Sequence, residues 1–298
     1  MCDKLIRTKF VYHYTSLEAI FALLHGYHRN GNYLSFRASN IYKVNDPNEM
    51  VSGFNVIKDI ILKYELQNQV PEEKRLSEIY NTLIYEDECK RDYLYGKGKE
   101  EVNHGIIPYV ISFSKHRDYL PMWSLYGKKG KGVCLKFDLS CLTNNMENCL
   151  DGFVYYDKRN NSVINEYDIN FLYDLYLRQY SNVDKVPIDR RIFELGTICF
   201  ALSPFFKHKD YMYEGEFRIV YNRSYTKQLS SRSSFLDAKS RIEPFVPINI
   251  PIDSLKEIII GPNADYDVMS HILSIELKEC GISSKIITQS KINFKHNK

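Results

Sequence analysis

Apolar residues follow two spacings along the chain, and segments of the two kinds are interspersed. Alternation with a period of two predicts half-buried strands, and spacings of three and four predict amphipathic helices. Strands are expected over 9–14, 33–39, 109–114, 132–138, 153–156, 216–221, 244–250, 255–260 and 285–288. Helices are expected over 17–24, 47–66, 71–94, 121–126, 163–181, 188–203 and 266–280.

Two of these helices carry start signals. Thr15 followed by Glu18 has the spacing of a capping box, and Gly26 suits the end of the same helix. Farther along, Asp46-Pro47-Asn-Glu49 combines an N-cap carboxylate, a proline at the first helical position and an acid in the first turn. We therefore interpret Asp46 and Glu49 as helix-capping residues rather than as an acid–base pair.

Short strands mixed with helices, without a regular strand–helix–strand repeat, favour an α+β fold over a doubly wound sheet. A chain of 298 residues is long enough for one large domain, and no linker or internal repeat divides it. We expect a single domain over 1–298, with helical insertions at about 47–104 and 158–206.

Composition restricts the function only weakly. The formal charge of +3 and the pI near 8.3 permit an anionic partner without requiring one. The 24 Tyr residues suit nucleotide sites, because each offers a ring and a hydroxyl, but they suit ordinary cores as well.

The spacing of the cysteines and the length of the apolar segments bear on metal binding and on cellular location. The seven Cys form no Cys-x-x-Cys pair and none has metal-ligand spacing to a His, so no metal site is expected. The first residues contain no apolar segment of signal-peptide length, and no apolar run of ~18 residues predicts a membrane span. The expectation is a cytoplasmic protein that binds neither membrane nor metal.

Common catalytic and nucleotide-binding motifs are missing from the sequence, including the phosphate loop, Gly-x-Gly-x-x-Gly, Gly-x-Ser-x-Gly and His-Glu-x-x-His. The segment 126–132 carries Lys128, Lys129 and Lys131 among glycines. Such a segment can bind phosphate groups, although a solvated turn is the more common explanation.

The strand expected over 216–221 carries charged residues that are candidates for a functional site. Its apolar residues alternate to one face, and Glu216 and Arg218 share the other. Glu214 has the same parity and is separated from Glu216 by Gly215, a residue that allows close approach of a ligand or of backbone. The alternative is a turn with two solvated acids.

Three further segments carry polar or aromatic candidates. His13 lies at the end of a strand just before a helix start, where anionic ligands gather, but it could equally be a core histidine bonded to a carbonyl. Ser112 and Ser114 share one face of a strand; the alternative is a strand that is only leaving the core. Trp123 and Tyr126 share one face of a short helix; the alternative is that their rings attach this helix to the core.

Six short segments occur in a fixed order: Tyr-His-Tyr-Thr-Ser at 12–16, Asn-Asp-Pro-x-Glu at 45–49, Ile-Ser-Phe-Ser at 111–114, Trp-x-x-Tyr-Gly at 123–127, Gly-Val-Cys-Leu-x-Phe-Asp at 132–138 and Glu-x-Glu-Phe-Arg at 214–218. Over residues 10–262 the chain thereby resembles the uncharacterised bacterial family numbered twenty-nine seventy-one among the domains of unknown function. That family supplies no settled activity; the resemblance suggests a toxin or phage-defence role.

The chain is more distantly similar to the ADP-ribosyltransferase superfamily, whose members have a split, mostly antiparallel sheet around a cleft for NAD. This resemblance implies His13 at the adenosine ribose, Ser112 and Ser114 as the middle serines, and Glu216 as the catalytic carboxylate, with Glu214 two residues before it. Phe113 departs from the usual Thr. Nicotinamide stacking is left open between Tyr14, Trp123 and Tyr126, and Thr15 and Arg218 complete the expected NAD-binding set.

Cleavage of the nicotinamide–ribose bond develops positive charge on the ribose, which a fixed carboxylate stabilises. Glu216 on a strand would be held rigidly, and Arg218 would bind the pyrophosphate or keep Glu216 ionised. The leading hypothesis is an NAD-dependent ADP-ribosyltransferase-like enzyme with a nucleic-acid or protein acceptor. The alternatives are an NAD glycohydrolase, a non-catalytic nucleic-acid-binding module that uses the lysine turn and tyrosines, and, third, a nuclease-like hydrolase that uses Glu and His.

Overall fold

A computed structural model describes residues 8–44, 49–72, 75, 77, 106–143, 146, 149–157, 196, 199–224, 234–235 and 244–293. Asp46 and Pro47, the helix expected over 163–181, and most of the helices expected over 71–94 and 188–203 lie outside the described residues.

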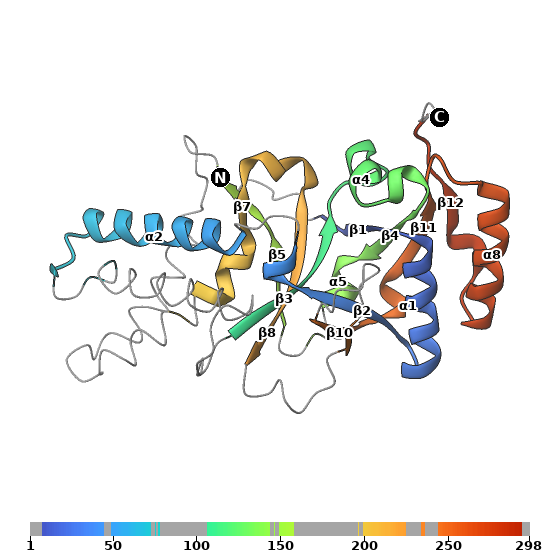
Figure 1. Cartoon of the computed structure of the whole chain (residues 1–298), viewed down its shortest axis with the longest axis horizontal. Helices are drawn as coiled ribbons and strands as arrows, with labels where there is room; N and C mark the ends of the chain where they lie inside the picture. The colour runs from blue at the N-terminus through green and yellow to red at the C-terminus, as the bar shows by residue number, and fades with distance from the viewer. Residues whose placement is uncertain are drawn as a thin grey trace.

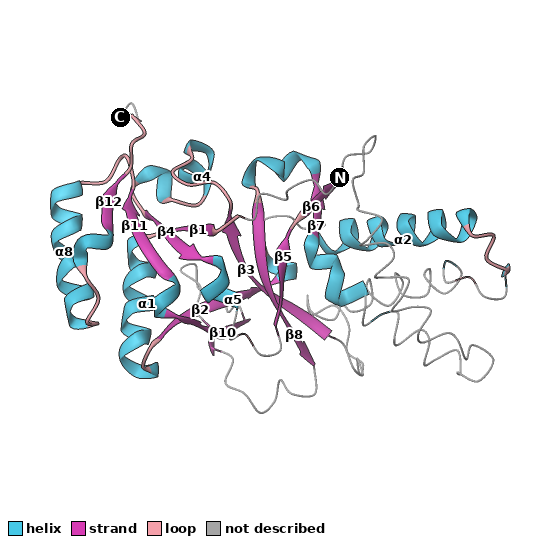
Figure 2. Cartoon of the chain, turned by 180° about the vertical axis from the view of Figure 1, so that it is seen from behind, coloured by secondary structure: helices cyan, strands magenta, loops and turns pink. Residues whose placement is uncertain are grey.

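Most of the described strands form one open sheet, and helices pack around it (Figures 1 and 2). The strand order is β12-β11-β4-β1-β3-β2-β10-β9, with β8 paired to β3 and β5 paired to β8. The strands are β1 (Phe10–Thr15), β2 (Tyr33–Asn40), β3 (Ile106–Ser114), β4 (Val133–Asp138), β5 (Cys149–Phe153), β8 (Glu216–Ser224), β9 (Ser234–Phe235), β10 (Pro244–Pro251), β11 (Leu255–Ile260) and β12 (Ile287–Gln289).

Neighbouring strands of this sheet are antiparallel, except that β11 and β12 are parallel. A separate parallel pair joins β6 (Tyr155–Asp157) to β7 (Phe206–His208). The expected α+β class and the mostly antiparallel sheet are therefore confirmed. The strand expected over 153–156 is in fact divided, because β5 ends at Phe153 and β6 begins at Tyr155.

Helices occupy opposite ends of the molecule. Helix α2 (Glu49–Gln67) extends away from the sheet at one end, and α1 (Leu17–Asn30) and α8 (Tyr266–Glu279) lie at the other (Figure 1). The shorter elements used below are α4 (Leu120–Leu125) and the 3-10 turns η3 (Lys128–Gly130), η5 (Ser203–Phe205) and η6 (Lys209–Glu214).

The capping residue and the end of α1 differ from the expectation. Ser16 caps the helix, since its Oγ accepts the amide hydrogen of Ala19 at 3.2 Å, whereas Thr15 is the last residue of β1. The helix also continues past Gly26 to Asn30. A Cβ on Gly26 would lie 3.2 Å from the Ser35 Cβ, so this glycine permits close packing of α1 on β2 rather than ending the helix.

Two apolar clusters cover the two faces of the sheet around β3 and β8. Phe113 and Phe217 belong to one cluster, with residues of α1 and α8, whereas Val110 and Val220 belong to another, with residues of α2. Successive side chains of a strand point to opposite faces, so both faces of β3 and β8 are covered. Ser114, Glu216 and Arg218 of these strands are consequently buried, whereas Ser112 is exposed.

Strand β3 is where the sheet changes partners. One of its edges pairs with β8 along the whole of Ile106–Ser114. The other edge pairs with β2 only at Tyr109 and Val110, and with β1 only at Ser114. β1 and β2 therefore diverge, and between them no described strand pairs with this edge of β3 at 111–113. We call this place the sheet gap.

Candidate functional site

A cavity of about 850 Å³ opens at the sheet gap, a volume typical of small-molecule sites. Residues of β1, β2, β3, β8 and α1 contribute to its walls. Nine of the ten residues proposed from the sequence line it: His13, Tyr14, Thr15, Ser112, Ser114, Tyr126, Glu214, Glu216 and Arg218.

Strand register explains why polar groups meet on one wall of the cavity. Ser112 is opposite Arg218, and Ser114 is opposite Glu216, so these four side chains share one face of β3 and β8. β2 continues the polar row, because Ser35, Arg37 and Ser39 alternate with the core residues of that strand and also line the cavity.

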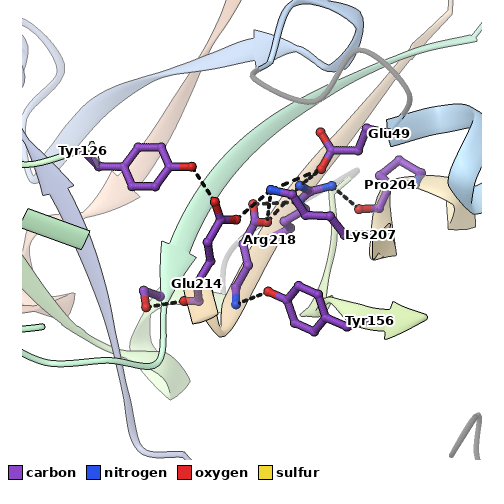
Figure 3. A network of polar contacts seen from close by, with 9 residues as sticks. Glu49, Tyr126, Tyr156, Pro204, Lys207, Glu214 and Arg218 are labelled. Carbon is purple, nitrogen blue, oxygen red and sulfur yellow. Dashed lines mark hydrogen bonds and ion pairs between the residues drawn. The ribbon is translucent and has the colours of Figure 1, made fainter. Parts of the chain in front are cut away.

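A buried ion-pair cluster, whose network of contacts is shown in Figure 3, contributes to the lining of the cavity. The Nε of Arg218 donates to Glu216 Oε1 at 2.7 Å, and the Nη2 of Arg218 donates to Glu216 Oε2 at 2.9 Å. The guanidinium also donates to the carbonyl of Pro204 and to the carboxylate of Glu49. Arg218 is 1% exposed, so its N–H groups form their hydrogen bonds within the protein and not with solvent.

Lys207 of β7 joins the two acids that the sequence singled out. Its Nζ donates to Glu214 Oε2 at 2.7 Å and to Glu216 Oε2 at 3.1 Å. The Tyr126 hydroxyl donates to the other oxygen of Glu214 at 2.5 Å. Glu214 and Glu216 are thus held side by side by one ammonium group.

Glu49, the first residue of α2, completes the cluster and is 1% exposed. Its Oε1 accepts from Arg218 and lies 3.5 Å from Lys207 Nζ, whereas its Oε2 has no hydrogen-bond partner among the described residues. The interpretation of Glu49 as a helix-capping residue was therefore incomplete, because its carboxylate pairs with β8 across the cluster.

The pKa values of these acids shift in opposite directions. Burial alone would raise the pKa of Glu216, but the charges of Arg218 and Lys207 outweigh burial and lower this pKa to about 2. For Glu49 the same two cations do not compensate for burial, and the pKa stays raised. Glu216 is consequently ionised across the whole neutral range.

The backbone around Glu216 is held by side chains of other segments. The amide of Glu216 donates to the Tyr156 hydroxyl at 2.8 Å. Ser114 Oγ donates to the carbonyl of Glu214 at 2.5 Å. The carboxylate therefore projects from a strand start whose backbone is held by these two hydrogen bonds.

His13 bridges the sheet gap. Its Nδ1 lies 2.9 Å from the carbonyl oxygen of Ser112, and because a carbonyl only accepts, Nδ1 carries the hydrogen. Burial lowers the pKa of His13, although the bond to Ser112 raises it in part, so the ring is neutral at pH 7. His13 is thus bonded to a backbone carbonyl, as in the ordinary explanation, and it also lines the cavity.

Trp123 does not lie on the cavity wall. Its ring is fully buried, donates from Nε1 to Asp118 at 2.8 Å and packs edge-on against Tyr14 at 5.0 Å. The expectation that Trp123 binds the ligand is therefore not met, and the ring attaches α4 to the core. Lysines of the neighbouring turn, Lys128, Lys129 and Lys131, are exposed.

Sequence reasoning missed Lys207 and Tyr156 and misread Glu49. Lys207 lies between Phe206 and His208 in a strand of three residues, directly after the segment 158–206 that was interpreted as a helical insertion. The available signal was the position of a lysine directly after the apolar run Pro204-Phe205-Phe206. Glu49 was visible as part of a motif, but its partner lies 169 residues away.

Neither a membrane span nor a metal cluster is found in the described part of the chain. No helix there is long and apolar enough to cross a membrane. The same residues contain no group of three or more His, Cys, Asp or Glu side chains able to hold a metal ion.

Comparison with known proteins gives a family match. Residues 122–219 match the model of a family described as "Protein of unknown function (DUF2971)". The resemblance to that family is thereby confirmed over a segment that includes Trp123, Tyr126 and the Glu-x-Glu-Phe-Arg motif. No curated protein and no solved structure matches the chain.

Proposed function

We propose that this protein is an NAD-consuming enzyme that breaks the bond between nicotinamide and ribose and passes ADP-ribose to a nucleic-acid or protein acceptor. A close variant is a glycohydrolase, in which water is the acceptor. The observation that carries the proposal is the convergence of His13, Ser112 and Glu216, which come from three different strands, on one cavity at the sheet gap.

The chemistry suits an ionised carboxylate that is held rigidly. As the C–N bond breaks, nicotinamide leaves with the electron pair and positive charge develops on the ribose. Glu216, with its low pKa, stays negative and can stabilise that charge. The acceptor oxygen or nitrogen then bonds to the ribose carbon and loses its proton, so the reaction needs no added oxidant or reductant.

Arg218 supports Glu216 rather than the substrate in this proposal. Its guanidinium is committed to Glu216, Glu49 and the Pro204 carbonyl, and it is almost completely buried. Of the two roles expected for Arg218, maintaining the ionised state of Glu216 is the better supported.

Tyr126 is the best-supported candidate for contact with the nicotinamide ring. Trp123 is sealed in the core, and the Tyr14 hydroxyl both donates to the His116 carbonyl and accepts from the Tyr119 amide. Tyr126 is only partly buried, lines the cavity and is bonded to Glu214.

The test uses NAD labelled in both the nicotinamide and the ADP-ribose parts, incubated with cell lysate and the purified protein. We expect nicotinamide release by the wild type and a reduction of about 10²- to 10³-fold in the Glu216→Gln variant. Glu257→Gln is the matched control, because Glu257 is also ion-paired, with Arg117 and Lys136, but does not line the cavity.

Label found on nucleic acid or protein supports transfer, and free ADP-ribose supports the glycohydrolase variant. The proposal is contradicted if the wild type releases no nicotinamide from NAD, whether or not NAD raises its melting temperature. Equal activity of wild type and Glu216→Gln, with both folded, also contradicts it.

A further inference from the structure

The charged residues that line the cavity are unequally partnered. Lys207 and Arg218, which line the cavity, are ion-paired with Glu49, Glu214 and Glu216. Arg37 also lines the cavity, yet no described residue forms an ion pair or hydrogen bond with its side chain. It is therefore a cation whose hydrogen-bond donors are available to a ligand.

Arg37 is held in a defined orientation despite being exposed. It lies on β2 opposite Pro247 of β10, and its guanidinium carbon is 4.9 Å from the centroid of the Phe245 ring. A guanidinium over an aromatic ring is restrained by the cation–π attraction, and its N–H edge remains free. Phe245 and Pro247 line the same cavity.

Arg37 lies far enough from the buried ion-pair cluster for an extended ligand to reach both. Glu216 and Arg218 lie on β8, and β3 stands between β8 and β2. Two strand spacings of ~4.8 Å give about 10 Å, and the divergence of β2 from β3 at the sheet gap adds to this. Ser35 and Ser39 flank Arg37 on the same face, so the wall around it is polar.

We infer that Arg37, stacked on Phe245, is a binding site for the phosphate groups of a nucleotide whose reacting ribose lies at Glu216. A planar guanidinium with a free edge forms paired hydrogen bonds to phosphate oxygens, which makes phosphate the ligand class that this group fits best. The identification of the nucleotide as the ADP part of NAD rests on the function proposed above; the assignment of Arg37 to phosphate does not.

The experiment measures binding alone, so it does not depend on turnover. The dissociation constants of ADP and adenosine are determined by titration calorimetry for wild type, Arg37→Gln and Arg75→Gln. Arg75 is an exposed arginine outside the cavity, and its substitution removes the same charge. We expect Arg37→Gln to weaken ADP binding about tenfold to hundredfold and to leave adenosine binding unchanged, with Arg75→Gln like the wild type.

Each result assigns success or failure to one of the two claims. ADP binding that depends on Arg37, in a protein that releases no nicotinamide from NAD, supports the phosphate site and refutes the proposed function. Cleavage of NAD together with ADP binding that is indifferent to Arg37 refutes the phosphate site alone. A wild type that does not bind ADP, or equal weakening of ADP and adenosine binding by Arg37→Gln, also overturns the inference.

Discussion

Glu216 and Glu49 contact the same guanidinium, yet their pKa values shift in opposite directions. Three carboxylates, those of Glu49, Glu214 and Glu216, share two buried cations, Lys207 and Arg218. One acid is therefore in excess, and Glu49 is the acid with a raised pKa and an unpartnered oxygen. A cluster in which Glu49 holds a proton is electrically neutral, which favours its burial.

The low pKa of Glu216 predicts a loss of stability in acid. Because the folded-state pKa of about 2 lies below the ordinary value of 4.5, Glu216 stabilises the fold above pH 4.5. This contribution, roughly 3 kcal/mol at about 1.4 kcal/mol per pKa unit, is lost as the pH falls from about 5 to 2. Urea unfolding followed by Trp123 fluorescence should show a shallower acid loss in Glu216→Gln than in the wild type. The same acid dependence in both proteins would contradict the assigned pKa.

Glu49 should show the opposite dependence on pH. The folded-state pKa of Glu49 is raised above its ordinary value of 4.5. The free energy of unfolding therefore decreases as the pH rises above 4.5, because the unfolded chain loses this proton more readily than the folded protein does. Glu49→Gln removes the ionisation and keeps an oxygen that can accept from Arg218. We expect its stability relative to the wild type to improve between pH 4 and 7. A growing destabilisation of Glu49→Gln over that range would contradict the raised pKa of Glu49.

At the residue scale, sequence alternation identified Ser112, Ser114 and Glu216, which do share one strand face and one cavity. Glu214 lines the same cavity, but it lies in η6 and not on the strand, because Gly215 has a left-handed conformation. The pattern could not reveal Glu49 or Lys207 as their partners, because α2 and β7 reach the cluster only through tertiary packing. It also could not decide whether Trp123 faces a ligand or the core. That outcome depends on Asp118, which accepts from the Trp123 Nε1, and on Tyr14, whose ring packs against the Trp123 ring in a T-shaped contact.

At the scale of elements, the position of α2 determines where the Glu49 carboxylate lies. α2 packs directly on η5, whose Pro204 carbonyl accepts from Arg218. At Gly53, one turn after Glu49, a Cβ would lie 2.4 Å from the carbonyl oxygen of Ser203 and 2.6 Å from its Cα. Only glycine permits this approach of helix to backbone.

Gly53→Ala should therefore displace α2 from η5. Overpacking of this kind costs about 1–3 kcal/mol, and we expect a corresponding fall in the free energy of unfolding measured with urea. Nicotinamide release should fall as well, since Glu49 moves relative to Arg218. Asn55→Ala, at an exposed position of the same helix, is the control and should be neutral. Unchanged stability in Gly53→Ala would show that α2 does not pack on η5 as described.

The positions of most helices and strands along the chain follow from the local sequence pattern, but the pairing of the strands does not. The alternating strand β2, the apolar strand β11 and the capped helix α8 occupy nearly the expected residues. The cap of the first helix is Ser16 and not Thr15, because both side chains are able to cap. The short strands β5, β6 and β7 carry too few alternating residues for period alone to separate them from turns.

At the scale of the whole molecule, the sheet gap depends on contacts between distant segments. The gap forms because β1 pairs mainly with β4, and β2 pairs mainly with β10, instead of both continuing along β3. Residues more than 100 apart in the chain pair in the first case, and residues more than 200 apart pair in the second. Local sequence pattern contains no information on such pairings. The chain order of six short motifs was therefore the stronger guide to a shared cavity.

The central claim is that the cavity at the sheet gap binds a dinucleotide, with the reacting ribose at Glu216 and the phosphates at Arg37. The most direct measurement is a crystal structure of the wild type with carba-NAD, an analogue that lacks the ribose ring oxygen and resists cleavage of the nicotinamide bond. The account predicts analogue density between β1 and β2, with the carbon attached to nicotinamide nearest Glu216 and the phosphate oxygens hydrogen-bonded to Arg37. An empty cavity at saturating analogue, or analogue bound elsewhere on the surface, would contradict it.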